Sequence, residues 1–504
     1  MAKICLCLTG STIDENLKTL DKYRSYIDIA ELRVDCLEPD ERLGIRHFPR
    51  LAGIPAILTI RRAIDGGRYS GGEGARIRTL AQGLAHAEAD SRRNFAYVDI
   101  EEDLVVPSLE EAARTFGTRI IRSYHNISGI HENISEKIKS MRNTGDELVK
   151  VAVTANSTAD VLNVFRASKV CAGRDFILVC MGHYGIYSRI LAEQFGSFLS
   201  CTSAINEGGE PAAPGQLDAR ELAELYRFHK ISKNTKIYGI IGNPLKASLS
   251  PWFFNTIFAL EDIDAVYVPF PIDSVSSFME LAGELKIQGL SVAAPYKEAV
   301  LPWLKQDSSK INPIGACNTM SLTDSGWLGE NTNIPGFSQS LLEFLGKRSL
   351  KRQKITIIGA GGAARAVAAE IHRLGGKAVI LNRTQHKARA IASLYKFNWG
   401  GLDSRGIELM YKHSDVIIQT TSVGMEGSNT ADLLLEYAFT GKEAVMDLIY
   451  RPEVTPFLKR AAQAGCRTRN GYDMFIRQAC LQYNRFTGKD FPKKHLSRIK
   501  SGGS

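Results

Sequence analysis

The sequence predicts an α/β protein in two halves: an N-terminal (β/α)8 barrel, and a second α/β half that carries a dinucleotide-binding domain. Two observations predict this class. Eight short apolar segments alternate with helix-compatible stretches over the first 220 residues, as is typical of repeated βα units. Later in the chain, ITIIGAGGAARAVAAEI joins an apolar strand to a helix through a glycine-rich turn, the pattern of a dinucleotide-binding fold.

The expected barrel strands are separated by stretches that can hold helices. In chain order the strands are KICLCL, IAELRVD, AILTIR, FAYVDIE, TRIIRSYH, LVKVAVTA, FILVCM and SFLSCTS. The helix-compatible stretches include ARIRTLAQGLAHAEA and STADVLNVFRAS. Eight units favour a closed barrel, whose active site would lie at the C-terminal ends of the strands. Polar residues cluster at these ends, among them Glu31, Arg33, Asp99 and Glu101. An open doubly wound sheet is the alternative.

A change of pattern at YRFHKISKNTK separates the two halves. We place the domain boundary near residues 228–236, where a new strand begins in IYGIIGNP. Further strands are expected at AVYVPFPI, IQGLSVAAP, AVILNRT, DVIIQTTS and EAVMDLIY, and a last helical region at GYDMFIRQACLQYNRF. Strands alternating with helices again favour an α/β fold.

The composition is that of an ordinary globular protein, with 44% hydrophobic and 23% charged residues. The net charge of +9 comes with no nucleic-acid motif, so we expect anionic small-molecule ligands and no nucleic-acid partner. The nine cysteines show no CxxC pair and no zinc spacing, which predicts reduced thiols and no metal site. No apolar run reaches the length of a membrane span and no secretory signal is evident, so we expect a cytoplasmic protein without a membrane partner.

Lys150 interrupts an apolar, β-branched run, VKVAV, that is expected to form a buried strand. Desolvation in an apolar barrel would lower the pKa of this lysine and make the neutral amine available. A neutral amine can form an imine with a ketone, and His125 on the preceding strand is a candidate for the base that removes a neighbouring proton. The alternatives are a structural Lys150 paired with an interior carboxylate and a His125 that is hydrogen-bonded in the core.

The glycine-rich turn of the second half is expected to bind the pyrophosphate of a dinucleotide. Gly359, Gly361 and Gly362 allow a tight turn and a close approach of the backbone to the ligand. The helix that follows presents free N–H groups and a favourable dipole. Ala364 replaces the third glycine of the usual pattern.

The end of the next expected strand, AVILNRT, bears on the choice of nucleotide. An acid at this place binds the ribose hydroxyls of NAD, whereas this chain has Asn382, Arg383 and Thr384. A guanidinium and a hydroxyl suit a 2′-phosphate, so we predict NADP as the cofactor. An ordinary surface arginine is the alternative. The loop from Thr421 to Met425 would line the nicotinamide side.

The motifs ELRVD, TIRRAIDGG, SYHN, VKVAV, MGHYGIYSR, FGS and APGQ occur in the order found in type I 3-dehydroquinate dehydratases. Roughly residues 3–225 therefore resemble that family. The resemblance implies that Lys150 forms a Schiff base and that His125 is the general acid/base in the dehydration of 3-dehydroquinate to 3-dehydroshikimate. The implied substrate contacts are Glu31, Arg33, Arg61, Arg189 and Gln216.

Two of these contacts have more definite implied roles, and one position departs from the family. Arg189 resembles the arginine that holds the substrate carboxylate, and Gln216 belongs to a mobile lid, NEGGEPAAPGQ. The family usually has Glu, as a partner that orients the catalytic histidine, where this chain has Asp65. Because Asp is shorter by one methylene, we expect activity that survives at a reduced level.

The second half resembles shikimate dehydrogenase over roughly residues 236–495, through GNPLKASLSP, PYK, GACNT, GENTN, GAGGAAR, NRT, TTSVGM, DLIYRP, TP and GYDMFIRQA. The whole chain thus resembles a bifunctional dehydroquinate dehydratase–shikimate dehydrogenase. The resemblance implies that Lys297 is the catalytic lysine and that Asn333 lies beside it. The implied substrate-binding residues are Ser248, Ser250, Asn318, Tyr450 and Gln478. The expected NADP-binding residues are Gly359, Ala360, Gly361, Gly362, Ala363, Asn382, Arg383, Thr384, Thr421, Met425 and Gly471.

The second half departs from its family at two positions. The family motif N-T-D reads Asn331-Thr332-Asn333 here, and Ala293 replaces a threonine. Losing the aspartate should lower the pKa of Lys297 and weaken its anchoring. Three outcomes stay open: a slow shikimate dehydrogenase, an enzyme with changed specificity such as for quinate, and a non-catalytic sensor that binds NADP and metabolites.

The resemblance also sets the expected domain limits. The dehydratase barrel is expected over residues 1–228, and the NADP-binding domain over residues 350–471. The substrate-binding domain is expected over residues 236–345, completed by helices near residues 472–495. The oligomeric state is not predicted.

Overall fold

The computed structural model describes residues 1–85, 90, 93–141, 146–171, 175–208, 211–245, 248–305, 315–426 and 431–502. The chain divides into two compact units. The first contains Met1–Ile237 and Phe258–Ile287, and the second contains Tyr238–Ile257 and Gln288–Ser504. No helix among the described residues is long and apolar enough to cross a membrane.

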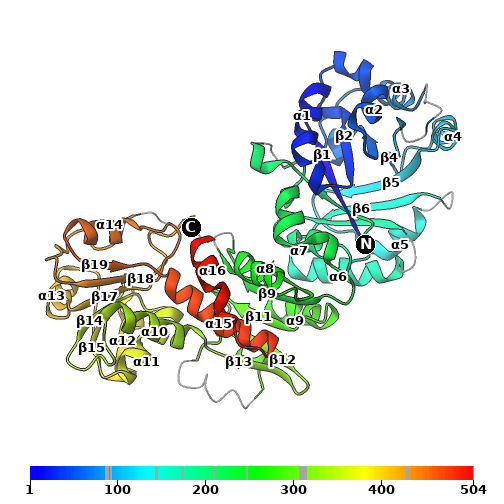
Figure 1. The fold of residues 1–504 in the computed structure, drawn as a ribbon. Coiled ribbons are helices and arrows are strands. Elements are labelled where there is room, and N and C mark those ends of the chain that lie inside the picture. The colour runs from blue at the N-terminus through cyan, green and yellow to red at the C-terminus, as the bar shows by residue number, and fades with distance from the viewer. Residues whose placement is uncertain are drawn as a thin grey trace. The chain divides into compact units, whose positions relative to one another are not determined.

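Eight parallel strands form a ring in the order β7-β6-β5-β4-β3-β2-β1-β8 (Figure 1). They are β1 (Lys3–Leu8), β2 (Ile29–Arg33), β3 (Ala56–Thr59), β4 (Tyr97–Glu101), β5 (Arg119–Asn126), β6 (Leu148–Thr154), β7 (Phe176–Met181) and β8 (Leu199–Thr202). An isolated parallel bridge between Phe176 and Ser197 joins the two remaining edges, so the ring is nearly closed. The predicted barrel is confirmed.

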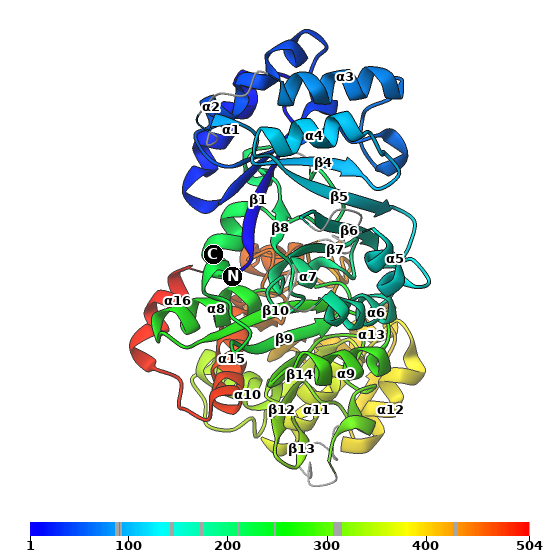
Figure 2. The same cartoon turned by 90° about the vertical axis from the view of Figure 1, so that its right-hand side faces the viewer.

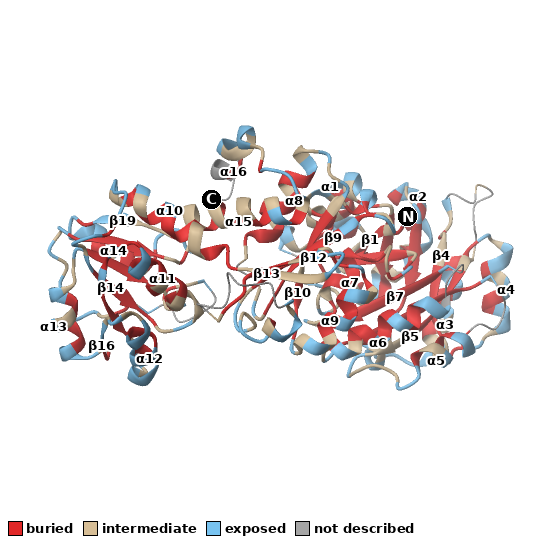
Figure 3. Ribbon diagram, turned by 90° about the horizontal axis from the view of Figure 1, so that it is seen from below, coloured by how far each residue is buried: buried red, intermediate tan, exposed pale blue. Residues whose placement is uncertain are grey.

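Helices cover the outside of this ring (Figures 1 and 2). They are α1 (Ile13–Tyr23), α2 (Phe48–Ala52), α3 (Glu73–Leu84), α4 (Pro107–Thr115), α5 (Ile134–Ser140), α6 (Thr158–Ser168) and α7 (Ile186–Ile190). Thr12 and Ser157 cap α1 and α6 by accepting a hydrogen bond from a backbone N–H three residues on. Figure 3 shows buried strands, whereas the helices expose one face, as amphipathic helices around a core should.

A mixed five-stranded sheet follows, in the order β10-β9-β11-β12-β13. Its strands are β9 (Lys236–Gly242), β10 (Ala265–Pro271), β11 (Gly289–Val292), β12 (Thr319–Thr323) and β13 (Gly326–Glu330). β11 is parallel to β9 and antiparallel to β12, and β12 and β13 form an antiparallel pair. The helices α8 (Ser250–Leu260) and α9 (Val275–Glu284) follow β9 and β10.

The remaining sheet has six parallel strands in the order β16-β15-β14-β17-β18-β19. They are β14 (Lys354–Ile358), β15 (Lys377–Leu381), β16 (Asn398–Gly400), β17 (Val416–Gln419), β18 (Ala444–Asp447) and β19 (Arg467–Arg469). The order reverses between β14 and β17, which is the switch point where such sheets bind dinucleotides. The expected Rossmann-type domain is confirmed.

Helices connect and flank the strands of this part of the chain. They are α10 (Asn333–Leu345), α11 (Gly362–Arg373), α12 (Gln385–Tyr395), α13 (Ser404–Lys412), α14 (Pro456–Gln463), α15 (Tyr472–Thr487) and α16 (Leu496–Gly502). The apolar core between sheet and helices includes Ile355 and Ile357 of β14 and Val367 and Ile371 of α11. The long helix α15 lies where the last helical region is predicted.

Candidate active sites

A cavity of about 100 Å³ lies inside the barrel at Lys150. Its lining comes from several strands and from the loop after β8, and consists of Cys7, Glu31, Arg33, Arg61, Asp65, Gly66, His125, Ile127, Lys150, Ala152, Val179, Met181, Arg189, Cys201, Ala212, Ala213, Pro214 and Gln216. Every barrel residue that the sequence analysis assigns to catalysis or substrate binding is in this set. Because parallel strands run side by side, residues far apart in the chain converge there.

The amine of Lys150 lies between two carboxylates. Its Nζ is 2.8 Å from Asp99 Oδ2 and 3.7 Å from Glu31 Oε1. Burial disfavours the charged amine, but the two carboxylates outweigh this effect and raise the pKa of Lys150. The prediction that the barrel lowers this pKa is therefore wrong, because the interior around the amine is charged and not apolar.

Asp99 connects the lysine to a wider network of buried polar groups. Its carboxylate lies 2.7 Å from Arg61 Nη2 and accepts a hydrogen bond of 2.5 Å from the Ser123 hydroxyl. Arg61 also binds Glu101 at 2.7 Å. Burial alone would raise the pKa of Asp99, but Arg61 and Lys150 lower it. Asp99 was not predicted as the partner of Lys150, which lies 51 residues away in the sequence. A usable signal was its place on the strand two residues before Glu101, because residues two apart on a strand face the same side.

His125 lies on β5 and faces the same side of the sheet as Lys150. Strand register pairs His125 with Ala152 and Ser123 with Lys150, so these four residues share one face. Burial and the positive charges of Arg61 and Lys150 lower the pKa of His125. The ring is therefore neutral at neutral pH. Its Nδ1 is buried without a hydrogen-bond partner in the described part of the chain, so it is available to accept a proton.

Asp65 does not orient His125 in this structure. Its Oδ2 lies 2.6 Å from Nε of Arg62, which also binds Asp103 at 2.9 Å. The nearby arginine thus holds the short carboxylate, while His125 Nδ1 has no partner among the described residues. The expected contact between Asp65 and the histidine is therefore not formed, because the Asp65 carboxylate pairs with Arg62, three residues earlier in the chain.

The two remaining arginines of the cavity differ in their partners. Asp35 holds Arg33 through two bonds, at 2.9 Å to Nε and 2.7 Å to Nη2. Among the described residues, the acceptors of Arg189 are two carbonyls, Cys201 at 3.1 Å and Pro214 at 3.3 Å. Burial lowers its pKa, and its Nε has no hydrogen-bond partner within the described residues. Arg189 is thus the cavity cation best placed to receive an anionic ligand.

Gln216 is held at the edge of the cavity by the loop after β8. Its Oε1 accepts hydrogen bonds from the Ser203 hydroxyl and from the Ala213 backbone N–H, the latter at 3.2 Å. Its Nε2 lies 3.5 Å from Cys7 Sγ. Residues 209–210 of the predicted lid lie outside the described residues, and the mobility of the lid stays a prediction.

Lys297 follows β11 in the second unit and has a different environment. Burial lowers its pKa, with only Cys317 acting in the opposite direction. No carboxylate in the described ranges forms an ion pair with it. A Cβ built on Gly362, at the start of α11, would lie 3.9 Å from Cδ of this lysine. The lysine therefore lies beside the glycine-rich turn of the dinucleotide-binding domain.

Asn333 and Asn318 belong to one buried hydrogen-bonded group. The Asn318 Nδ2 donates to Asn333 Oδ1 and to Thr332 Oγ1, both at 3.0 Å, and its Oδ1 accepts from the Thr332 backbone N–H at 2.7 Å. Asn333 thus makes a hydrogen bond but brings no negative charge. Asn331 donates to the Ala316 carbonyl at 2.8 Å, and its buried Oδ1 has no partner among the described residues. Asn331 was not predicted as a site residue, although it belongs to the same Asn331-Thr332-Asn333 motif.

The predicted substrate serines lie where α8 begins. Ser248 Oγ accepts a hydrogen bond of 3.3 Å from the backbone N–H of Ser250. Burial raises the pKa of Tyr450, and a hydrogen bond with Ser248 opposes this shift, so Tyr450 and Ser248 are neighbours. Gln478 lies on α15, close to α10: a Cβ on Gly336 would come within 3.1 Å of its backbone nitrogen. Glycine at that position permits the close packing of the two helices.

The turn after β14 fits the pyrophosphate of a dinucleotide. Gly359 has a φ of +114°, and a Cβ there would lie 2.4 Å from Thr420 Oγ1 after the neighbouring strand β17. Gly361 precedes α11 and has no side-chain cap, and a Cβ there would meet no atom within 4 Å. No side chain among the described residues caps the start of α11, and the space beside Gly361 is open, which leaves room for an anion at the first turn of this helix.

Most of the other predicted cofactor residues follow strands β14, β15 and β17 in the chain, while Ala363 lies in the first turn of α11 and Gly471 directly precedes α15. The full set is Ala360, Ala363, Asn382, Arg383, Thr384, Thr421, Met425 and Gly471. Arg383 is exposed at the end of β15, and Asn382 Nδ2 donates to the Thr384 carbonyl at 2.9 Å. No acid stands at this strand end, so the residues present suit a 2′-phosphate.

The fold and the two sites define a chain with two catalytic parts. The barrel brings an amine and a neutral imidazole into one cavity, as amine catalysis on a carbonyl compound requires. The second part places a lysine beside a dinucleotide-binding turn, as expected of a dehydrogenase.

Comparisons with known proteins identify both parts. Three family descriptions match in succession: "Type I 3-dehydroquinase" over residues 4–233, "Shikimate dehydrogenase substrate binding domain" over residues 240–320, and "Shikimate / quinate 5-dehydrogenase" over residues 342–426. A chloroplastic bifunctional 3-dehydroquinate dehydratase/shikimate dehydrogenase of Arabidopsis thaliana is 30% identical over 99% of this chain and 84% of its own length. The shikimate biosynthesis protein AroDE of Chlamydia pneumoniae is 26% identical over 95% of this chain and 94% of its own.

A shikimate dehydrogenase (NADP(+)) of Dictyoglomus thermophilum is 37% identical over 53% of this chain and 98% of its own length. The chain belongs to the family of bifunctional 3-dehydroquinate dehydratase/shikimate dehydrogenases. The resemblance inferred from the motifs is confirmed.

Proposed function

We propose that the chain catalyses two consecutive reactions, the Schiff-base dehydration of 3-dehydroquinate to 3-dehydroshikimate and the NADPH-dependent reduction of that product to shikimate. The observation that supports the first reaction is the cavity that holds Lys150, His125 and Arg189 together, where the guanidinium of Arg189 has no carboxylate partner among the described residues. The family membership supports the pairing, since the product of one half is the substrate of the other.

In the barrel, Arg189 holds the substrate carboxylate and Lys150 reacts with the ketone. The lysine gives up its proton, its nitrogen attacks the carbonyl carbon, and one water leaves as the imine forms. The protonated imine draws electrons from the adjacent C–H bond, and His125 accepts that proton. His125 then returns the proton to the departing hydroxyl, which leaves as water, and a further water hydrolyses the imine to release 3-dehydroshikimate and free Lys150.

In the second half, Lys297 donates a proton to the carbonyl oxygen as it becomes a hydroxyl. NADPH, when bound, supplies the hydride for this reduction. The first turn of α11 would hold the pyrophosphate, and Arg383 with Thr384 would hold the 2′-phosphate. Ser248 and Ser250 bind the substrate carboxylate, with Tyr450 beside it, and Asn318 and Gln478 contact the ring hydroxyls.

A second candidate function concerns this half alone. No carboxylate within the described ranges forms an ion pair with Lys297, and Asn333 stands where the family has an aspartate. An active dehydratase joined to a quinate-specific dehydrogenase, or to a non-catalytic NADP and metabolite sensor, would also accommodate these replacements.

The test is to mix the purified chain with 3-dehydroquinate and NADPH and to follow enone absorbance and NADPH loss together. We expect both signals to change and shikimate to appear. Enone accumulation with intact NADPH would contradict the second activity. Repeating the assay with quinate and NADP separates changed specificity from a sensor, because only the former reduces NADP. Borohydride trapping with 3-dehydroquinate should label Lys150, and labelling elsewhere would contradict the Schiff-base assignment.

The domain limits of the proposal are residues 1–228 for the dehydratase, 236–345 with helices near 472–495 for substrate binding, and 350–471 for NADP binding. The start of β9 at Lys236 and the order of the last six strands support these limits. A cytoplasmic location remains a prediction from the sequence.

A further inference from the structure

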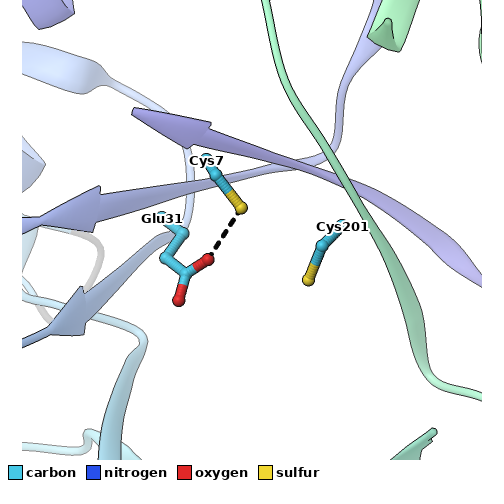
Figure 4. A group of neighbouring side chains, drawn as sticks. All are labelled: Cys7, Glu31 and Cys201. Carbon is cyan, nitrogen blue, oxygen red and sulfur yellow. Dashed lines mark hydrogen bonds between the residues drawn. The ribbon is translucent and has the colours of Figure 1, made fainter. Parts of the chain in front are cut away.

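Two thiols and a carboxylate meet inside the barrel. They belong to Cys7 on β1, Glu31 on β2 and Cys201 on β8, and their ligand atoms lie within 4.8 Å of one another (Figure 4). All three residues are buried, and all three line the cavity at Lys150. The catalytic steps proposed above use neither thiol.

Strand register explains why these side chains converge. Cys7 pairs with Glu31 across β1 and β2, and Cys201 pairs with Cys5 across β1 and β8. Since Cys5 and Cys7 are two residues apart, their side chains point to the same face, toward the inside of the ring. The three ligands are far apart in the sequence, so no spacing motif could reveal them.

The carboxylate of Glu31 is oriented toward the sulfur atoms. Its Oε1 accepts a hydrogen bond of 2.8 Å from the Thr59 hydroxyl, and its Oε2 lies 2.9 Å from Cys7 Sγ. One oxygen is therefore held by a neighbouring strand, and the other is presented to the thiols. Hydrogen-bonded carboxylates of this kind are typical of metal ligands, whose direction is set by a second group.

We propose that Cys7, Glu31 and Cys201 bind a thiophilic divalent cation, Zn²⁺ or Cd²⁺, and that its binding inhibits the reaction at Lys150. Two sulfurs and one carboxylate oxygen are donors that zinc accepts, and three protein ligands leave a fourth position open to the cavity. Each thiol loses its proton when it binds the metal. The two lost protons balance the two charges of the cation, so the buried arginines and Lys150 meet no added net charge.

Inhibition follows from the position of Glu31. Its Oε1 lies 3.7 Å from Lys150 Nζ, so a metal on this carboxylate draws it from the lysine and occupies space that the substrate needs. Binding of the cation does not depend on the proposed function, whereas the inhibition rests on it.

The test is a Cd²⁺ titration of the reduced, full-length chain, followed by the ultraviolet absorption of the cadmium–thiolate bond. We expect about one equivalent to bind at this site with that absorption, and Cys7→Ser and Cys201→Ser each to weaken binding by more than about tenfold. Cys180→Ser is the matched control, because Cys180 is also a buried cysteine on a strand. The residues of β7 that face the barrel interior are Ile177, Val179 and Met181, so Cys180 points away from the proposed site. It should bind Cd²⁺ as the unaltered chain does.

The same samples are then assayed for both activities. Enone formation from 3-dehydroquinate should fall in step with cadmium occupancy, and reduction of added 3-dehydroshikimate should not. Equal Cd²⁺ uptake by the unaltered chain and both serine variants would overturn the site, and full dehydratase activity at full occupancy would overturn the inhibition. If a variant fails to fold, cadmium NMR of the unaltered chain identifies the ligands, because the cadmium chemical shift depends on how many sulfur atoms bind the ion. A chemical shift that indicates no sulfur ligand would also overturn the site. If 3-dehydroquinate is not dehydrated even without metal, the proposed function fails, while the absorption still decides the site.

Discussion

The two lysines of this chain carry the same functional group in opposite electrostatic surroundings. Lys150 is held between Asp99 and Glu31, whose charges raise its pKa, whereas burial without a carboxylate partner among the described residues lowers the pKa of Lys297. The carboxylates thus favour the ammonium form of the first amine, and the second gives up its proton more readily than an ordinary lysine.

The difference shows that burial alone does not decide the charge of a lysine. The carboxylates beside Lys150 stand on strands β2 and β4, and the barrel sets them beside the amine in fixed positions. They offset the desolvation of the ammonium and hold it in place. At Lys297 no carboxylate among the described residues offsets the desolvation, and only Cys317 opposes it.

Removing each lysine should have the largest effect and should separate the two halves. Lys150→Ala is expected to reduce enone formation from 3-dehydroquinate to background, because Lys150 is the one lysine among the described residues that line the cavity. Lys297→Ala should leave that rate intact and abolish the reduction of added 3-dehydroshikimate. The measurement is a separate assay of each half-reaction. Loss of both activities in either variant would contradict independent sites.

Breaking the ion pair of Lys150 should cost the barrel stability. Asp99→Asn leaves Arg61 and Lys150 without their shared carboxylate, so we expect the free energy of unfolding to fall by about 3–5 kcal/mol. The control is Asp103→Asn, which removes an exposed partner of Arg62 and should cost about 0–1 kcal/mol. Denaturant unfolding at neutral pH measures both.

The pH dependence of the Asp99 contribution has a definite sign. Because the folded state lowers the pKa of Asp99, its stabilisation is present above the unfolded value of about 3.9 and is lost as pH falls through the lower folded value. The stability difference between the unaltered chain and Asp99→Asn should therefore shrink in strong acid. A stability difference that stays constant into strong acid would show that the charge of Asp99 does not cause the stabilisation.

The pH profile of the dehydratase should report the lowered pKa of His125. Protonation of a catalytic base reduces kcat/KM, so the acid limb is expected below the ordinary histidine value of about 6.5. His125→Ala should lower kcat by about 10²–10⁴-fold and remove this limb. An acid limb at or above 6.5 in the unaltered chain would contradict a neutral His125 as the resting base.

Placing a carboxylate at position 333, where the family has an aspartate, should have the smallest effect of these changes. Asn333→Asp is expected to raise the pKa of Lys297 and move the alkaline limb of the dehydrogenase to higher pH, with a turnover number that rises several-fold. Asn398→Asp adds the same charge at an exposed position of β16 and is the control. An unchanged profile in Asn333→Asp would mean that this site has adapted to the amide.

Strand and turn patterns were sufficient to predict most of the fold. The eight apolar segments became β1 to β8, and the turn at Gly359 stands at the switch point of the last sheet. Local patterns succeed here because alternating βα units and a glycine at positive φ are requirements of the backbone itself. The strand pattern pointed to Lys150 and His125, whereas Arg189 and Gln216 came only from the family resemblance; all four line the cavity, and their roles remain predictions.

The partners of those residues were not predictable in the same way. Arg62 engages Asp65, leaving Nδ1 of His125 without a partner among the described residues, and Asp99 reverses the expected pKa shift of Lys150. Such contacts depend on which side chains meet across neighbouring strands. They also depend on side-chain length, as with Asp65, which is one methylene shorter than the glutamate of the family.

The sequence by itself determined the two-part architecture, the family and the residue types that carry the chemistry, because these follow from periodicity, turns and short motifs. Only the tertiary structure decided the opposite pKa shifts of the two lysines, the unpartnered nitrogen of His125 and the meeting of Cys7, Glu31 and Cys201. Electrostatic interactions and metal ligation act through space over a few ångströms, and closing the barrel brings together groups that the chain keeps far apart.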